Sequence, residues 1–248
     1  MCDKTSEFNK PRSAGVTDTG NVRSVNQDDY HRDPDEKFFI VADGMGGHAG
    51  GQEASQIATR TITNYLKENW NSDKPSKQLL TEAFKKANEA ILQDQQNHSD
   101  RSDSGTTAVV VVLRNEESMV AHVGDSRLYR FRKDEIEQIT EDHTWVARSV
   151  KLGQITQEEA RIHPWRHVLS QCLGRKDLQL IDIQPLEIQS GDRLVLCSDG
   201  LTEELTPDII CDLLKSGADC EAVANNLVNT AKDKGGHDNI TVIVVNID

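Results

Sequence analysis

Two kinds of hydrophobic pattern alternate along this chain. Helical spacing of apolar residues, with one apolar face every three to four positions, predicts helices at 52–69, 79–91, 156–161, 207–214 and 220–234. Short continuous apolar runs predict strands at 38–42, 107–113, 119–123, 128–131, 178–188, 193–197 and 240–245. Residues 13–30 also resemble a strand, bent around Gly20. Because several strands are joined by short turns, we expect antiparallel sheets rather than repeated βαβ units. The run at 107–113 is almost entirely apolar, which indicates a central strand covered on both faces.

Two segments fall outside this pattern. Residues 1–12 are polar and are expected to form a loose tail. Residues 145–175 have little long-range periodicity but contain histidines, arginines and two of the three tryptophans, which is typical of a surface flap. Without internal repeats or a linker-like composition, residues 13–248 are predicted to form one domain with this flap inside it.

Composition excludes several classes of protein. The net charge of −13 argues against nucleic acid or an anionic membrane as the main partner. No run of about 18 apolar residues occurs and the first residues lack the apolar core of a signal peptide, so a cytoplasmic location is expected. The five cysteines include no CxxC pair, which indicates neither a disulfide framework nor a zinc site. No spare amphipathic segment offers an interface, and a monomer is therefore expected.

Four aspartates share one local context. Asp43, Asp125, Asp199 and Asp238 each lie at the edge of an apolar strand, next to Gly, Ser or Asn. One Asp-Gly pair alone is ordinarily a turn, but four strand-edge aspartates can gather in one cleft. Gathered carboxylates repel one another unless cations compensate them. Oxygen ligands without His or Cys select Mg²⁺ or Mn²⁺, and two such ions can activate a bridging water. Arg23 adds a guanidinium able to hold a phosphate through two hydrogen bonds.

The glycine-rich segment at 44–49 also fits a dinucleotide-binding fingerprint, G-x-G-x-x-[GA], after a strand and before a helix. A polar loop and a second predicted helix follow, where a βαβ unit needs a second strand. The dinucleotide interpretation is therefore weak. A Walker A loop is excluded because no Gly-Lys-[Ser/Thr] sequence occurs, and no segment has the spacing of a calcium-binding loop.

Six motifs in order along the chain resemble the bacterial branch of the metal-dependent protein serine/threonine phosphatases, the PPM or PP2C family. They are Asp-x-Gly-x-x-Arg-x-x-Asn-x-Asp at 18–28, Ala-Asp-Gly-Met-Gly-Gly-His at 42–48, Ser-Gly-Thr-Thr-Ala at 104–108, Gly-Asp-Ser-Arg at 124–127, Cys-Ser-Asp-Gly-Leu-Thr at 197–202 and Asp-Asn-Ile-Thr at 238–241. The stretch 160–175 is most similar to the cyanobacterial member that dephosphorylates the signalling protein PII, which suggests phosphorylated PII as a substrate.

The resemblance implies an α+β fold, a four-layer α-β-β-α sandwich of two antiparallel sheets flanked by helix pairs, with the metals at one end. It also implies hydrolysis of phosphoserine and phosphothreonine by direct attack of a metal-bridging water or hydroxide. Two ions would be bound tightly and a third more weakly. The implied roles are Asp43 bridging two ions, the Gly44 carbonyl on the first, Asp199 and Asp238 on the second, Asp125 with Asp199 on the third, Asp28 acting through metal-bound water, and Arg23 on the phosphate.

The chain departs from the eukaryotic relatives at Met45, where they have a histidine proposed as general acid. The proton for the leaving oxygen would then come from His48, from a water on the third metal, or from neither; a helix-capping role for His48 is the alternative. In the flap, His163, His167 and Arg175 lie near the cleft by resemblance. We expect His167 and Arg175 to shape substrate access, while surface or packing roles remain open for both histidines.

Two other functions compete with a protein phosphatase. One is a non-catalytic phosphoprotein-binding module of the same fold, but a decayed member would be expected to lose metal aspartates, and all four are present. The other is a phosphomonoesterase acting on small molecules, because the metals and Arg23 would contact only the phosphate group.

Overall fold

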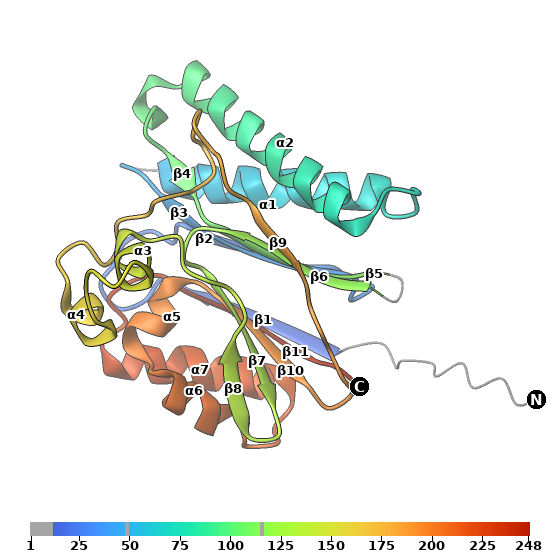
Figure 1. Ribbon diagram of the computed structural model, residues 1–248, viewed down its shortest axis with the longest axis vertical. Helices are drawn as coiled ribbons and strands as arrows, with labels where there is room; N and C mark the ends of the chain where they lie inside the picture. The colour runs from blue at the N-terminus through green and yellow to red at the C-terminus, as the bar shows by residue number, and fades with distance from the viewer. Residues whose placement is uncertain (1–11, 48–49, 115–116) are drawn as a thin grey trace, which may run out of the picture.

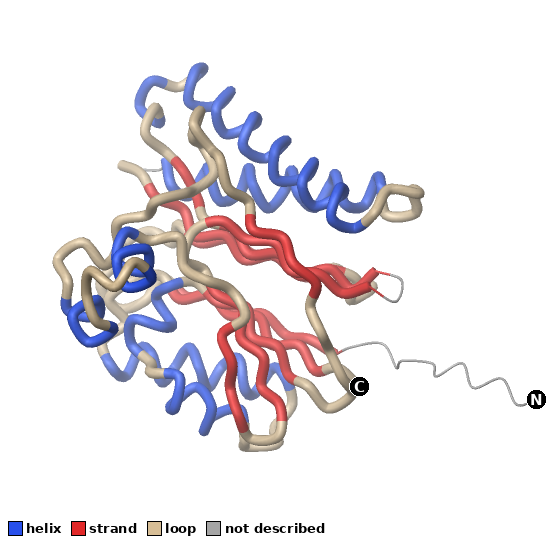
Figure 2. The backbone as a smooth tube through the Cα atoms, viewed as in Figure 1, coloured by secondary structure: helices blue, strands red, loops and turns tan. Residues whose placement is uncertain are grey.

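The protein is an α+β sandwich in which two antiparallel sheets face each other and helices cover both outer faces (Figure 1). The computed structural model describes residues 12–47, 50–114 and 117–248. Figure 2 shows the two strand layers side by side, with helices above and below. The predicted fold class is thereby confirmed. The predicted polar tail lies outside the described residues except for Arg12, which already belongs to the first strand.

The first sheet has the strand order β2-β3-β5-β6-β9, with the short β4 paired to β3. Its strands are β2 (Asp28–Arg32), β3 (Phe38–Met45), β4 (Gly105–Thr106), β5 (Ala108–Arg114), β6 (Glu117–Val123) and β9 (Asp182–Pro185). The predicted central strand is confirmed, since β5 lies between β3 and β6. The strand predicted at 178–188 is wrong in length: Leu178 and Ile181 pack against the core beneath the helices, and only four residues pair with β6.

Two long helices, α1 (Gly50–Asn69) and α2 (Ser76–Asn97), cover this sheet and pack against each other as the predicted hairpin (Figure 1). A short 3₁₀ turn, η1 (Ser99–Arg101), follows α2. The buried Arg114 donates hydrogen bonds to the carbonyls of Trp70 and Lys74, which fixes the loop between the two helices. Since a helix follows α1 and β3 pairs antiparallel with both neighbours, no βαβ unit is formed and the dinucleotide interpretation fails.

The second sheet has the order β1-β11-β10-β7-β8. Its strands are β1 (Arg12–Asp18), β7 (Arg127–Arg132), β8 (Glu135–Gln138), β10 (Arg193–Cys197) and β11 (Ile240–Asn246), and its helices are α5 (Asp199–Glu204), α6 (Pro207–Leu214) and α7 (Cys220–Lys234). One long helix and two short ones thus take the place of the predicted helix pair. The strand-like piece at 13–30 is two strands, β1 and β2, which belong to different sheets.

Successive side chains along a strand face two different cores. Phe38 and Ile40 of β3 face the core beneath α1 and α2, whereas Phe39 and Val41 face the second sheet. Residues of β10 and β11, including Leu194 and Ile243, fill the space between the sheets from the other side. Burial on both faces explains why these strands are continuously apolar instead of alternating.

The segment 145–175 forms a flap at one end of the sandwich, next to α5 (Figure 1). It contains two short helices, α3 (Trp145–Lys151) and α4 (Gln157–Ile162). Its first residue is joined to a later part of the flap by the hydrogen bond from the Trp145 backbone N–H to the Val168 carbonyl, 2.8 Å. Leu173 then pairs with Thr106 of β4, which fixes the flap beside the end of β3 where Asp43 lies.

Candidate metal centre

Two aspartates face each other across the first sheet. Asp28 opens β2 and pairs directly with Asp43 on β3. Like charges at directly opposed positions destabilise a sheet, so this pairing needs a compensating group. Gly44 follows Asp43 at a point of close approach, because a Cβ on Gly44 would lie 1.9 Å from the Gly51 carbonyl oxygen at the start of α1. Only glycine allows the helix to begin so near the carboxylates.

The second sheet brings two more aspartates to the same place. Asp199 is the first residue of α5, just after β10, and Asp238 lies just before β11. Gly200 allows these two turns to meet, since a Cβ there would lie 2.0 Å from the Asn239 carbonyl oxygen. The carboxyl groups of Asp43 and Asp199 are within hydrogen-bonding reach of each other. The ends of both sheets therefore supply one cluster, as the sequence predicted.

Burial and mutual repulsion raise the pKa of Asp28, Asp43 and Asp125. Burial, followed by the charges of Asp28 and Asp199, raises the pKa of Asp43 well above its ordinary value. Burial is also the largest cause that raises the pKa of Asp28, to about 7, with hydrogen bonds opposing it. Asp125, buried in the turn between β6 and β7, has a pKa raised well above its ordinary value by burial and then by Asp199. The cluster is thus unfavourable as a set of bare anions.

The donor atoms fit hard divalent cations. The Oδ1 atoms of Asp28 and Asp199 are buried and have no hydrogen-bond partner within the described part of the chain. Buried carboxylate oxygens are normally satisfied, so these two atoms point to a ligand. Asp43 and Asp199 remain partly open to solvent, which leaves a path for an ion. Oxygen donors in this arrangement suit Mg²⁺ or Mn²⁺ rather than a softer metal.

Two residues whose roles the sequence did not reveal hold the cluster together. Ser198 Oγ donates a hydrogen bond of 2.8 Å to Asp28 Oδ2 and accepts one of 3.0 Å from the Thr241 backbone N–H. Asn239 donates from its side chain to the carbonyls of Thr19 and Val25, so that the loop between β1 and β2 is fastened beside Asp238. Both residues adjoin a predicted metal aspartate, and this position was the only sign of their importance in the sequence. Their hydrogen-bond partners could not be predicted, because these partners are distant in sequence.

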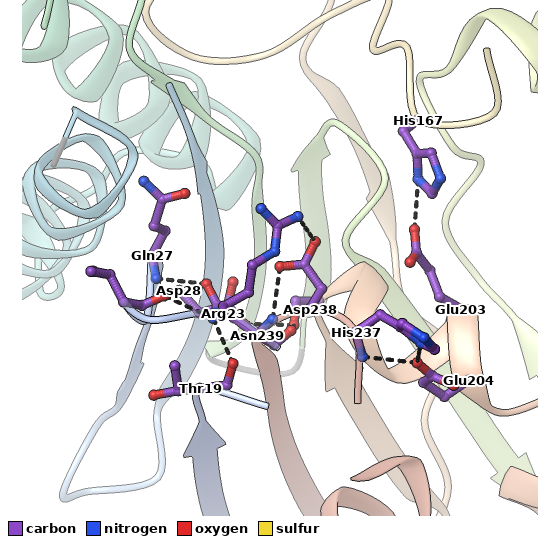
Figure 3. A network of polar contacts seen from close by, with 12 residues as sticks. Thr19, Arg23, Gln27, Asp28, His167, Glu203, Glu204, His237, Asp238 and Asn239 are labelled. Carbon is purple, nitrogen blue, oxygen red and sulfur yellow. Dashed lines mark hydrogen bonds and ion pairs between the residues drawn. The ribbon is translucent and has the colours of Figure 1, made fainter. Parts of the chain in front are cut away.

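Arg23 lies at the mouth of the cluster. Its guanidinium Nη2 is 2.7 Å from Asp238 Oδ2, and about half of its side chain is exposed, 53% (Figure 3). The guanidinium is therefore held next to a predicted metal ligand, and within the described part of the chain only one of its N–H groups is used by a hydrogen bond. This is the position expected for a group that binds the substrate phosphate.

The flap contacts α5 through His167, whose Nδ1 lies 2.6 Å from Glu203 Oε1 (Figure 3). His167, Asp199 and Glu203 place possible ligand atoms within 4.8 Å of one another. Partial burial lowers the pKa of His167, and partial burial together with the charges of Asp199 and Asp238 raises the pKa of Glu203 to about 7. Glu203 was not identified from the sequence, because nothing in its local pattern distinguishes it from an ordinary helix-surface acid.

Two other predicted residues are not brought to the cluster. His163 stacks on Trp145 with ring centroids 4.9 Å apart and accepts a hydrogen bond from the Trp165 backbone N–H. These contacts fit the packing role that the sequence left open for this histidine. Arg175 forms an ion pair with Asp177, at 2.9 Å. His48 lies outside the described residues.

The site and the fold together are those of a protein whose clustered carboxylates suit divalent metal ions. Comparison with known proteins specifies the family. Residues 21–240 match the protein phosphatase 2C family, and this chain belongs to it as a serine/threonine protein phosphatase.

Three relatives illustrate the match. The serine/threonine phosphatase stp of Listeria welshimeri is 33% identical, over 92% of this chain and 93% of its own length. The PPM phosphatase of Mycobacterium smegmatis in complex with cacodylate has a TM-score of 0.85 and 34% identity, and covers 96% of this chain and 98% of its own. The catalytic domain of the phosphatase PstP in complex with two manganese ions has a TM-score of 0.83 and 31% identity, with coverages of 96% and 99%.

No helix in the described part of the chain is long and apolar enough to cross a membrane.

Proposed function

We propose that this chain hydrolyses phosphoserine and phosphothreonine in proteins with Mg²⁺ or Mn²⁺ held by Asp43, Asp199 and Asp238. The strongest support is the pair of buried Oδ1 atoms on Asp28 and Asp199, which have no hydrogen-bond partner among the described residues. Both aspartates also have a raised pKa, chiefly because they are buried. A structure with two manganese ions among the relatives supports the same metal chemistry.

We assign the following roles to the residues of the site. Asp43, the Gly44 carbonyl, Asp199 and Asp238 would hold two ions. Asp125, which is buried in the turn between β6 and β7, would hold a weaker third ion together with Asp199. When bound, the ions supply Lewis acidity that lowers the pKa of a water towards neutral. Asp28, held by Ser198, orients water, and Arg23 holds the phosphate.

The donor of the leaving-group proton is not fixed by the described residues. Met45 ends β3 in the position where eukaryotic relatives have a histidine. His48 stays a prediction because it lies outside the described residues, and a water at the third ion is the second candidate. A His48→Gln variant tests His48 as the donor: the alkaline limb of the pH–rate profile for phosphopeptide hydrolysis should change if His48 supplies the proton and remain unchanged if water does.

A substrate panel tests the proposed function. With Mn²⁺ present, phosphothreonine and phosphoserine peptides should be hydrolysed with kcat/KM well above that for small metabolite phosphates, such as glucose 6-phosphate. Comparable rates for both classes would favour the small-molecule phosphomonoesterase. Phosphopeptide binding without turnover by folded, metal-loaded protein would favour a non-catalytic binding module.

Phosphorylated PII belongs in the same panel. The resemblance of residues 160–175 to a PII phosphatase is its only support, and none of the relatives reported above is named for activity on PII. The proposal requires faster release of phosphate from phosphorylated PII than from a phosphopeptide with the same local sequence. A cytoplasmic location and a monomeric state likewise remain predictions; light scattering of the purified protein tests the second.

Replacing Arg23 should weaken phosphate binding. Arg23→Ala removes a charge-assisted contact worth about 1.5–3 kcal/mol, so kcat/KM for a phosphopeptide should fall roughly 10- to 100-fold. Arg23→Lys should recover only part of this, because a lysine cannot form two parallel hydrogen bonds. Steady-state kinetics of both variants provide the measurement, and full activity in Arg23→Ala would remove this residue from the phosphate site.

Replacing His167 tests the flap contact. His167→Ala breaks the bond to Glu203 and leaves that acid beside Asp199 without a partner. Turnover of a phosphoprotein should fall several-fold, and turnover of para-nitrophenyl phosphate should fall less, because only the protein substrate reaches the flap. Arg175→Ala is the matched comparison: its partner Asp177 lies on the flap's outgoing segment, and a smaller effect is expected. Unchanged turnover of both substrates in His167→Ala would end this proposal.

A further inference from the structure

The exposed large hydrophobic side chains are concentrated in two segments that each contact the metal centre, one through Arg23 and the other through His167. Among the described residues, all of them except Leu180 lie in two segments, the loop between β1 and β2 and the flap: Val22, Val25, Leu152, Ile162, Trp165 and Val168. Isolated exposed apolar residues need no explanation, but a concentration next to a binding site indicates an interaction surface.

The loop between β1 and β2 presents two of these side chains, Val22 and Val25, which are 64% and 43% exposed. They flank Arg23, which faces Asp238 (Figure 3). The loop is fixed in place, because Asn21 donates to the carbonyls of Lys232 and Gly235 and the Val25 carbonyl accepts from Asn239. The two valines are therefore held beside the phosphate-binding position.

The flap presents the second apolar group. Ile162 is 82% exposed and Trp165 is 55% exposed. The Trp165 ring is held edge-on against Trp145 at 5.1 Å, and Val168 is bonded through its backbone to both tryptophans. His167, between Trp165 and Val168 in sequence, fastens this segment to Glu203 on the other side of the Arg23–Asp238 pair (Figure 3). Ordered, exposed aromatic groups are typical of binding surfaces.

We propose that these two segments form a substrate-recognition rim, consisting of Val22, Val25, Ile162, Trp165 and Val168, which binds apolar side chains next to the phosphorylated residue of a protein substrate. The inference rests on the proposed phosphatase function. A phosphate held at Arg23 places the neighbouring residues of its chain over the loop on one side and the flap on the other. Apolar side chains there would remove both surfaces from water.

The occupant is a phosphorylated protein segment rather than a membrane or a nucleic acid. The rim borders a phosphate-binding arginine, and the chain as a whole has a net charge of −13, which disfavours both anionic surfaces. A small phosphate ester would reach Arg23 without contacting Ile162 or Val22. The rim therefore predicts selectivity among phosphoproteins that the metal ligands alone cannot provide.

Matched phosphothreonine peptides test the rim. One series carries Val or Leu at the positions next to phosphothreonine, and the other carries Ser at the same positions. Contact with the rim removes part of such a side chain from water, so kcat/KM should be roughly 10-fold higher for the apolar series. Para-nitrophenyl phosphate, which has no flanking residues, measures the metal centre alone.

The double variant Val22→Ser/Ile162→Ser should reduce the apolar preference to about 2-fold or less and leave para-nitrophenyl phosphate hydrolysis unchanged. Leu180→Ser is the matched control, because Leu180 is 44% exposed but lies outside both segments; the preference should survive in it. The rim proposal would be contradicted if the native protein showed no preference for the apolar peptides, or if the double variant kept that preference. Absence of hydrolysis of every peptide and of para-nitrophenyl phosphate would instead contradict the proposed function itself.

Discussion

Asp43→Asn should abolish phosphatase activity and, in the metal-free protein, raise the melting temperature. Asp43 pairs with Asp28 across the sheet and contacts the carboxyl group of Asp199. An asparagine keeps the size of the side chain, removes one charge from the cluster, and can donate its amide N–H to Asp199. The activity should fall by more than about 100-fold, since replacing even the partners of metal ligands costs 10- to 100-fold.

The opposite signs of these two effects distinguish a functional cluster from a structural one. Removing a charge from a set of repelling carboxylates stabilises the metal-free fold, whereas removing a structural hydrogen-bond acceptor destabilises it. Asp177→Asn is a matched control, because Asp177 is exposed and pairs only with Arg175 among the contacts described; its activity should be unchanged. Two results would together contradict the assignment: an Asp43→Asn protein that melts lower than the native protein when both are metal-free, and the same variant retaining activity in Mn²⁺.

Metal removal should have the second large effect. Chelation with EDTA should abolish turnover and lower the melting temperature, and Mn²⁺ should restore both. At a metal concentration about 100 times Kd the stabilisation is about 2.7 kcal/mol, which for a chain of this length corresponds to roughly 5–10 °C. Differential scanning calorimetry across a Mn²⁺ series, repeated with Mg²⁺, provides the measurement. A melting temperature that does not depend on metal concentration would contradict a metal centre.

The metal-free protein should also lose stability as the pH rises. The folded-state pKa of Asp28 is raised to about 7 by burial and by its neighbours, above the ordinary value of 3.8. A group with a raised pKa stabilises the fold fully below its unfolded value, and this stabilisation is lost as the pH rises through the folded value. With EDTA, the melting temperature should therefore decline between about pH 4 and 7, and saturating Mn²⁺ should weaken this decline. An EDTA profile that rises through this window would contradict the argument.

The parts of this structure that depend on local pattern were predictable. The helices α1, α2 and α7 follow from apolar spacing, and the central position of β5 follows from its unbroken apolar run. The aspartates were recognisable because each adjoins Gly, Ser or Asn at a strand edge, and strand edges meet at the end of a sandwich. Their convergence is what the structure shows for Asp43, Asp125 and Asp199.

Features that depend on contacts between distant segments were not predictable. Glu203 is one of two adjacent acids on α5, and only the folded flap shows that it binds His167 while Glu204 binds His237 (Figure 3). The strand predicted at 178–188 was too long because apolar residues there pack against helices instead of joining the sheet. The rim residues are recognised by their exposure to solvent, which depends on the whole fold. Ile162 is exposed and Ile57 is buried although both are isoleucines, so residue type alone could not identify the rim.

Phosphate release from a phosphothreonine peptide, measured in Mn²⁺, in EDTA, and in Mn²⁺ with Asp199→Asn, tests the central claim most directly. We expect turnover in Mn²⁺, none in EDTA, and a loss of more than about 100-fold in the folded variant, because Asp199 would be shared by two metal sites. Turnover that persists in EDTA, or in Asp199→Asn, would show that the chemistry does not depend on this carboxylate cluster.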